Sequence, residues 1–136
     1  MMTKKSPAWR KYERDLVIYN HVETGVSAEK HGEISDAIAA FEKAAIMGSI
    51  YARNRLGTIF SDVIKPHQPS RAVYWYKAGV RLGDCSSAWD LAMHYSGLGN
   101  KRWYRHWLTV AKRMGEIDAA EELKTGKWWR KHNDLP

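Results

Sequence analysis

Apolar residues recur along most of the chain at intervals of three and four, the spacing that places side chains on one face of an α-helix. Ala37, Phe41 and Ala44 share one such face, and Ala52 and Leu56 share another. Small residues stand on or beside these stripes, at Ala44, Gly57, Gly79 and Ala92. They would let neighbouring helices approach closely, so the pattern predicts a protein built from packed helices.

The first stripe is repeated along the chain. Residues 37–48 are matched by residues 72–83, and more weakly by residues 104–115. Each copy ends in a glycine, at Gly48, Gly83 and Gly115, so the copies follow one another at two similar offsets. Glycine readily adopts the left-handed backbone conformation that ends a helix, so each copy is predicted to be a helix that stops at its glycine.

A second, shorter segment follows each of these glycines. The three segments are residues 52–60, 87–95 and 119–124. Their leucines, Leu56, Leu91 and Leu123, keep the same two offsets as the glycines. Ser35 and Ser70 precede the first helices of two copies and are predicted to cap them. The predicted unit is a helix, a tight glycine turn and a second helix.

These segments resemble the Sel1-like repeats, which are relatives of the tetratricopeptide repeats. The family's Trp-Tyr-x-Lys-Ala-Ala-x-x-Gly is similar to residues 40–48 and 75–83, and its Ala-x-x-x-Leu-Gly-x-x-Tyr is similar to residues 52–60. The resemblance covers about residues 27–125, and the third copy departs from it. It implies an all-α fold, an α-solenoid of stacked antiparallel helix pairs with two clear repeats and one degenerate repeat.

We therefore expect a single domain over residues 1–136. Residues 8–32, with Trp9, Tyr12 and Leu16 at helical spacing, are predicted to form one or more amino-terminal capping helices. Residues 33–125 are expected to hold the repeats, and residues 126–136 a basic carboxy-terminal tail that closes the other end. Terminal units of repeat proteins differ from the others because they meet water.

Composition narrows the classes of function. The chain has a formal net charge of +7 and seven tryptophans, and no apolar run approaches the length needed to cross a bilayer. A lone Cys85 excludes an internal disulfide, agrees with a reducing compartment and is predicted to be buried as a small apolar residue. We expect a cytoplasmic, bacterial protein without membrane contact, and the positive charge suggests an acidic partner.

Candidate binding residues lie beside the core stripe of the second helices. The resemblance implies that this neighbouring stripe faces a concave surface where a protein partner binds. The expected protein-binding residues are Tyr51, Asn54, Thr58, Ser86, Trp89, Met93, Glu121 and Trp128. Trp89 and Met93 would be apolar anchors or would fill space between repeats, and Tyr51 and Asn54 would offer hydrogen bonds.

Candidate catalytic and metal-binding patterns are weak. The six histidines show no His-x-x-x-His or Glu-x-x-His spacing, so no metal site is predicted. Gly97-Leu98-Gly99 lacks the rest of a phosphate-binding loop and is predicted to be a turn. No catalytic residue and no cofactor are expected, so the sequence favours a protein that is not an enzyme.

Two functions remain open at this point. The first is a protein–protein interaction module, an adaptor or an immunity protein that neutralises a cognate toxin, because short members of the Sel1-like family often look like immunity proteins. In that case the basic surface would meet an acidic toxin or effector. The alternative is binding of RNA or single-stranded DNA, which becomes credible if arginine and tryptophan side chains converge on one surface.

Overall fold

The structure is a computed structural model that describes residues 4–134, and within them it is all-α, with no β-strand. The eight α-helices are α1 (Pro7–Lys30), α2 (Ile34–Ile46), α3 (Ile50–Thr58), α4 (Pro69–Arg81), α5 (Cys85–Gly97), α6 (Lys101–Arg113), α7 (Ile117–Thr125) and α8 (Lys127–Asn133). A short π-helix, η1 (Ile59–Val63), continues α3. The predicted domain limits, Met1 and Pro136, lie outside the described residues.

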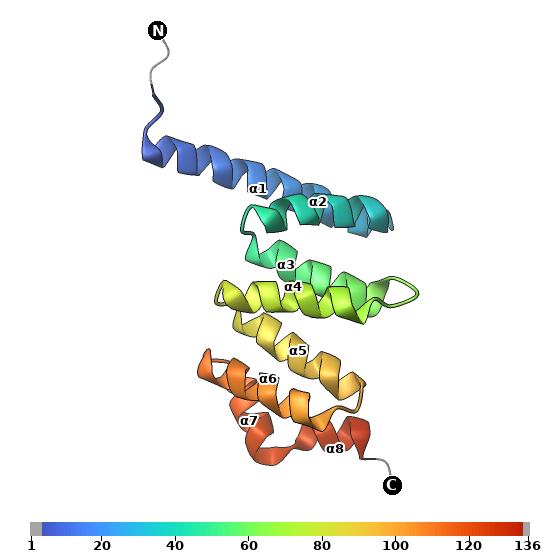
Figure 1. Ribbon diagram of the computed structural model, residues 1–136. Helices are drawn as coiled ribbons and strands as arrows, with labels where there is room; N and C mark the ends of the chain where they lie inside the picture. The colour runs from blue at the N-terminus through green and yellow to red at the C-terminus, as the bar shows by residue number, and fades with distance from the viewer. Residues whose placement is uncertain (1–3, 135–136) are drawn as a thin grey trace.

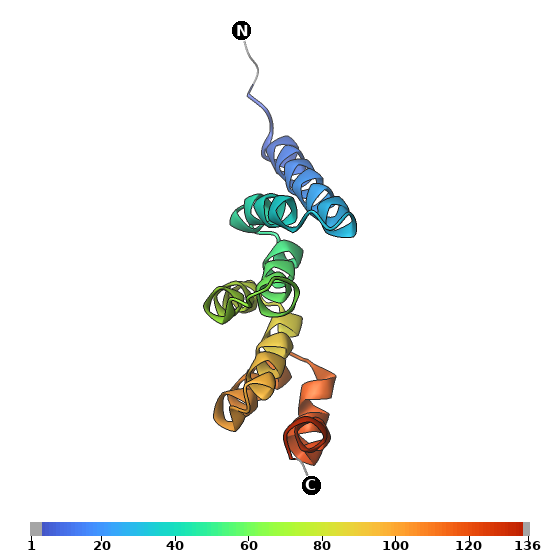
Figure 2. The same cartoon turned by 90° about the vertical axis from the view of Figure 1, so that its right-hand side faces the viewer.

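Helices that follow one another in the chain pack as antiparallel pairs, and the pairs form an elongated stack from α1 to α8 (Figure 1). The two ends of the chain therefore lie at opposite ends of the stack. In Figure 2, helices α2, α4 and α6 form the left-hand side, α3 and α5 lie in the middle, and α7 and α8 lie on the right. The first and second helices of the predicted units thus present different sides of the molecule.

The helix positions confirm the spacing seen in the sequence. Helices α2, α4 and α6 each have 13 residues, and their starts at Ile34, Pro69 and Lys101 repeat the two offsets found between the turn glycines. Gly48 and Gly83 have φ values of 101° and 86°, in the left-handed region that favours glycine. The predicted helix, glycine turn and helix is therefore confirmed at these positions.

The predicted serine caps are wrong by two residues. Helix α2 begins after Glu33 and α4 after Gln68, so Ser35 and Ser70 lie inside the first turns. Neither Glu33 nor Gln68 makes a capping hydrogen bond through its side chain. Proline is favoured at the first helical position because it has no N–H to leave unpaired, which explains why α4 starts at Pro69.

The pairs approach closely at glycines. A β-carbon at Gly57 in α3 would lie only 2.5 Å from the ring of Tyr76 in α4, and one at Gly25 in α1 would lie 2.6 Å from the ring of Phe41 in α2. Helix α1 therefore packs on α2 as α3 packs on α4. The predicted amino-terminal cap is one continuous helix that occupies the place of a second helix in a preceding pair.

The carboxy-terminal segment differs from the predicted basic tail. Residues 127–133 form α8, which packs against α5, and the Trp129 side chain is buried against the ring of Tyr104 at 5.0 Å between ring centroids. The sequence gives no periodic signal for this helix, because basic residues flank the adjacent Trp128 and Trp129 and only Trp129 is buried.

The core runs along the whole stack and consists of alanines with larger apolar side chains between them, among them Phe41, Leu56 and Leu91. Cys85 is half-buried at the first position of α5, rather than buried as the sequence predicted. No helix among residues 4–134 is long and apolar enough to cross a membrane.

Candidate functional site

Helix α5 carries the two predicted anchors, Trp89 and Met93, one turn apart on the same face. Both side chains are partly buried and pack against the core, and each also lines a separate hollow in the surface. These residues therefore fill space between helix pairs, as one of the two alternatives predicted, and their remaining surface lines the hollows.

The first hollow, here the α3–α5 hollow, has a volume of about 430 Å³. It is lined by Thr58, Ser61, Asp62, His67, Pro69, Tyr76, Asp90, Met93, His94, Gly97 and Leu98. At its wall the Tyr76 hydroxyl lies 3.1 Å from Thr58 Oγ1 and 3.3 Å from Ser61 Oγ, so these polar groups bond to one another. Burial lowers the pKa of His94, which favours its neutral form.

The predicted hydrogen-bonding residue Asn54 is engaged inside the molecule. Its Nδ2 donates to Asp90 Oδ2 at 2.8 Å and to Ser87 Oγ at 3.2 Å, which ties α3 to α5. Burial raises the pKa of the Asp90 carboxyl, while the hydrogen bond from Asn54 works in the opposite direction. Asn54 thus positions a carboxylate at the edge of the α3–α5 hollow and does not itself offer its amide to a partner.

The second hollow, here the α5–α8 hollow, has a volume of about 350 Å³. It is lined by Trp89, Asp118, Glu121, Glu122, Thr125, Lys127, Trp128 and Lys131. Trp128 stacks on His132 at 3.9 Å between ring centroids and keeps 40% of its surface exposed. The structure therefore brings together three of the predicted residues, Trp89, Glu121 and Trp128, from three different helices.

Three predicted residues line neither hollow: Asn54, whose amide is bonded inside the molecule, and the two exposed residues Tyr51 and Ser86. Tyr51 is exposed near the start of α3, where its ring lies 6.2 Å from that of Phe41, and Ser86 is exposed in the first turn of α5. Neither lines the α3–α5 hollow or the α5–α8 hollow. The sequence placed them on the right helices, but both lie too close to the amino-terminal ends of those helices to reach the hollows.

The hollows carry more carboxylates than the net charge of the chain suggests. Asp62, Asp90, Asp118 and Glu121 form no ion pair with any residue in the described range. The two arginines of α3 are used elsewhere: Arg53 donates to the carbonyl oxygens of Ala45 and Ala78, and Arg55 pairs with Glu29 at 2.6 Å. Local negative charge therefore prevails in the α3–α5 hollow, and both signs meet in the α5–α8 hollow.

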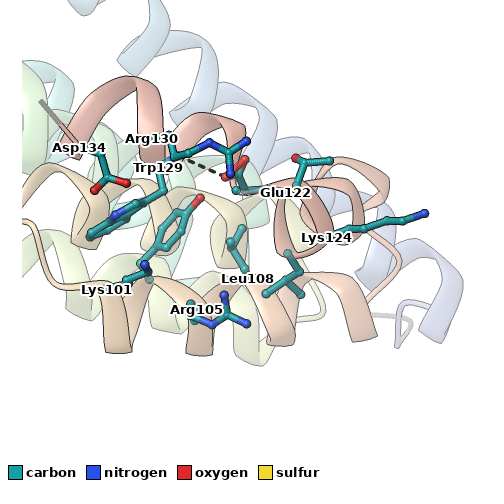
Figure 3. Close-up of a pocket in the computed structure, with 12 residues that line it drawn as sticks. Lys101, Arg105, Leu108, Glu122, Lys124, Trp129, Arg130 and Asp134 are labelled. Atoms are coloured by element: carbon teal, nitrogen blue, oxygen red, sulfur yellow. Dashed lines mark hydrogen bonds between the residues drawn. The ribbon is translucent and has the colours of Figure 1, made fainter. Parts of the chain in front are cut away.

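A third hollow of about 290 Å³ lies between α6, α7 and α8 (Figure 3). Its buried carboxylate, Glu122, accepts the backbone N–H of Trp128 at 2.9 Å and of Trp129 at 3.2 Å. This carboxylate satisfies the start of α8, where the helix dipole favours negative charge. Glu122 thus holds the last helix in place, and Lys124 points away from the hollow in Figure 3.

Tyr104 lies beside Glu122 in this third hollow. Burial, together with the neighbouring carboxylate, raises its pKa, so the phenol stays protonated. Its hydroxyl forms no hydrogen bond of normal geometry with a described residue. The pair anchors α8, and no group of three or more metal-ligating side chains comes together within residues 4–134.

Sequence reasoning missed Asp62 and Asp90, which define the charge of the α3–α5 hollow. Asp90 directly follows Trp89 in the sequence and lies one turn before His94. The helical spacing that joins Trp89 to Met93 therefore did not select Asp90. Asp62 lies in η1, beyond the part of the second helix that the repeat pattern covers. The sequence indicates Asp62 in one way only: it lies one helical turn after Thr58, which was a predicted binding residue.

Comparisons of the chain with protein-family models, with curated proteins and with solved structures give no match. The class that the structure defines is an all-α protein of eight helices, within residues 4–134, packed in sequential antiparallel pairs. Evidence for function therefore comes from the surfaces of this stack.

Proposed function

We propose that this protein is a Sel1-like solenoid that acts as a binding module without enzymatic activity, and that its α5 surface holds a segment of another protein. The α5 surface is defined as Trp89, Met93 and Trp128 together with the two hollows that they line. Met93 lines the α3–α5 hollow, and Trp89 and Trp128 line the α5–α8 hollow. The observation that supports the proposal is this combination of accessible apolar anchors with carboxylates that have no ion-pair partner among the described residues.

The charge of the hollows indicates what kind of segment fits. Asp62 and Asp90 at one hollow and Asp118 and Glu121 at the other would meet lysine or arginine side chains of a partner. Trp89 and Met93 between them would contact an apolar side chain of the same segment, as tryptophan often does at binding hot spots. The partner segment at this surface is therefore proposed to be basic and apolar.

This charge changes the expectation for an immunity protein. The acidic toxin patch suggested by the net charge does not suit the α5 surface, whose carboxylates suit a basic segment. A toxin-neutralising role and an adaptor role use the same kind of contact, so both fall within the proposal. In either case the apolar anchors supply affinity, and the carboxylates supply orientation and rate of association.

The test is selection of random twelve-residue peptides on the purified protein, followed by affinity measurement of the enriched peptides by calorimetry. We expect enrichment of lysine or arginine together with tryptophan, leucine or phenylalanine. Trp128→Ala should weaken the selected peptides by about tenfold, the size typical of a hot-spot truncation. The carboxylate change Asp118→Asn should weaken them less.

The matched control is Trp103→Ala, since Trp103 on α6 is 41% exposed and Trp128 is 40% exposed. The control should leave peptide affinity unchanged. Peptides without basic residues, or binding that is lost in Trp103→Ala and retained in Trp128→Ala, would show that the α5 surface is not the binding site. Thermal unfolding of both variants checks that neither change disturbs the fold.

A further inference from the structure

Helices α4 and α6 contain no aspartate or glutamate, although the chain has 15 acidic residues. They carry eight basic residues, and all eight are exposed: Arg71, Lys77, Arg81, Lys101, Arg102, Arg105, Lys112 and Arg113. None of them forms an ion pair with a residue in the range 4–134. These two helices thus carry eight positive charges and no negative charge of their own.

The two helices lie on the same side of the stack, on the left in Figure 2. A side-chain contact also joins them, because Lys77 Nζ of α4 lies 5.9 Å from the ring centroid of Trp107 in α6. This contact and the common side of the two helices place their outward basic residues on the same side of the stack.

Helical spacing aligns the outward side chains. On α4, Tyr74, Lys77 and Arg81 lie on the face away from the buried residues Ala72 and Gly79. On α6, Arg102, His106 and Arg113 lie on the face away from the buried residues Tyr104 and Leu108. These six outward residues, together with Trp103, are called the α4–α6 face.

Aromatic rings stand among the cations of this face. Tyr74 is 59% exposed and Trp103 is 41% exposed. Trp103 is held by ring contacts with His106 at 5.1 Å and with Tyr95 at 6.1 Å between centroids, so its exposed side is presented in a defined orientation. Exposed rings that are braced from behind can stack on a flat ligand without losing much side-chain freedom.

We propose that the α4–α6 face binds single-stranded nucleic acid, with its lysines and arginines on the phosphates and with Trp103 and Tyr74 stacked on bases. Proteins that bind single strands combine a positively charged track with aromatic platforms, and this face has both. A duplex hides the faces of its bases, so stacking on Trp103 requires a single strand. Binding of this kind reads no particular sequence.

An acidic protein surface is the competing occupant, and the rings argue against it. Carboxylates would satisfy the cations equally well but would leave Tyr74 and Trp103 without a flat partner. The proposal is independent of the proposed protein binding at the α5 surface, because it uses α4 and α6 and a different set of side chains.

The test uses fluorescence anisotropy with labelled twelve-residue oligouridylate and oligothymidylate, a twelve-base-pair duplex, and a labelled twelve-residue polyglutamate peptide as the acidic-protein surrogate. Both single strands should bind more tightly than the duplex and the peptide. The logarithm of the association constant should fall with the logarithm of salt concentration with a slope of about −2 to −3.5, as expected for three to five neutralised phosphates.

Variants separate stacking from charge. Trp103→Ala should weaken single-strand binding by about tenfold without changing the salt slope, and Trp103→Phe should restore most of the affinity because a ring remains. The double variant of Arg102→Ala and Arg113→Ala should weaken binding and also reduce the salt slope by about 1.4, since two phosphate contacts are lost. Trp128→Ala, at matched exposure, should have no effect.

Three outcomes would overturn the proposal. Polyglutamate that binds as tightly as the single strands would assign the face to an acidic protein. Equal affinity for the duplex, or no loss in Trp103→Ala, would show that the rings do not stack on bases. Because all the altered side chains are exposed, circular dichroism melting of each variant should match that of the unaltered protein.

Discussion

The α4–α6 face and the α5 surface belong to the same helix stack but differ in local charge. Helices α4 and α6 hold exposed lysines and arginines and no acid, whereas the surface around α5 presents Asp62, Asp90, Asp118 and Glu121. The first and second helices of each pair share one alanine-rich core. The charge of each side therefore varies independently of packing, and one small stack presents two different surfaces.

The largest expected effect comes from breaking the stack that carries both surfaces. In Gly57→Ala the new methyl group would meet the Tyr76 ring, which is buried and has little room to move. We expect the free energy of unfolding to fall by about 1–3 kcal/mol, and both binding activities to be lost together on warming. Denaturant unfolding followed by circular dichroism measures the change.

Gly97→Ala is the control for this change, because a β-carbon at Gly97 meets no atom within 4 Å. Its stability should be unchanged or slightly raised. The next pair of helices has Ala92 and Leu108 at the positions equivalent to Gly57 and Tyr76. Adding Tyr76→Leu to Gly57→Ala should therefore recover part of the loss, and a purely additive double variant would contradict the contact.

The second prediction concerns the independence of the two surfaces. Trp103→Ala should weaken only oligonucleotide binding, and Trp128→Ala should weaken only peptide binding, each by about tenfold or about 1.4 kcal/mol. The double variant should show both losses without coupling, as expected for sites that share no partner. Oligonucleotide titrations in the presence of saturating peptide measure this, and competition between the two ligands would mean one shared site.

A smaller effect on stability is expected at Asp90, whose carboxyl group contributes to the charge of the α5 surface. Its pKa is raised, mainly by burial, so the folded protein holds this proton more tightly than the unfolded chain does. The resulting stability is full below the ordinary pKa of aspartate and is lost as the pH rises through the raised value. Asp90→Asn keeps an oxygen acceptor for Asn54, so the variant should be at least as stable at pH 7.

Urea unfolding at several pH values tests this sign, and the affinity of a basic peptide should fall in the same variant. Asp118→Asn is the comparison, since Asp118 is exposed and lines the other hollow. If Asp90→Asn were less stable than Asp118→Asn at pH 7, the negative charge of Asp90 would be stabilising the contact between α3 and α5.

The smallest effect is expected at His94, on the wall of the α3–α5 hollow. Burial lowers its pKa, so its contribution to stability is full above the ordinary pKa of histidine and is lost as the pH falls through the lowered value. His94→Gln should flatten this part of the stability curve. The exposed His132 offers a control, and an equal flattening in His132→Gln would show that His94 is not the group responsible.

The fold was predictable to the extent that its signals are local. Helical spacing and the recurrent glycines gave the positions of α2 to α7, because hydrogen bonding within a helix and the left-handed turn at Gly48 depend on neighbouring residues. The predicted cap at Ser70 was wrong because proline is favoured at the first helical position and α4 starts at Pro69, whereas α2 starts at Ile34, one residue before Ser35. Helix α8 was not predicted because the carboxylate of Glu122, in the preceding helix, holds it in place. The pattern of its own seven residues does not indicate that contact.

The residues of the candidate site were predictable only in part. Trp89, Met93, Thr58, Glu121 and Trp128 line the hollows, because the spacing that defines a helix face also defines which side chains stand beside the core. Asn54 was assigned to a partner, but its amide bonds to Asp90 and Ser87 of the next pair. Whether a polar side chain forms its hydrogen bonds inside the molecule depends on residues that lie far away in the sequence.

The sequence by itself determined helices α2 to α7, the regular offset between successive helix pairs, and the excess of positive charge. Only the tertiary structure decided where that charge lies: α4 and α6 lie on one side of the stack, where Lys77 reaches the ring of Trp107, and carboxylates of η1, α5 and α7 line the hollows. The physical reason is that helix formation follows from local hydrogen bonds and spacing, whereas the field at a surface is the sum over side chains that packing brings together.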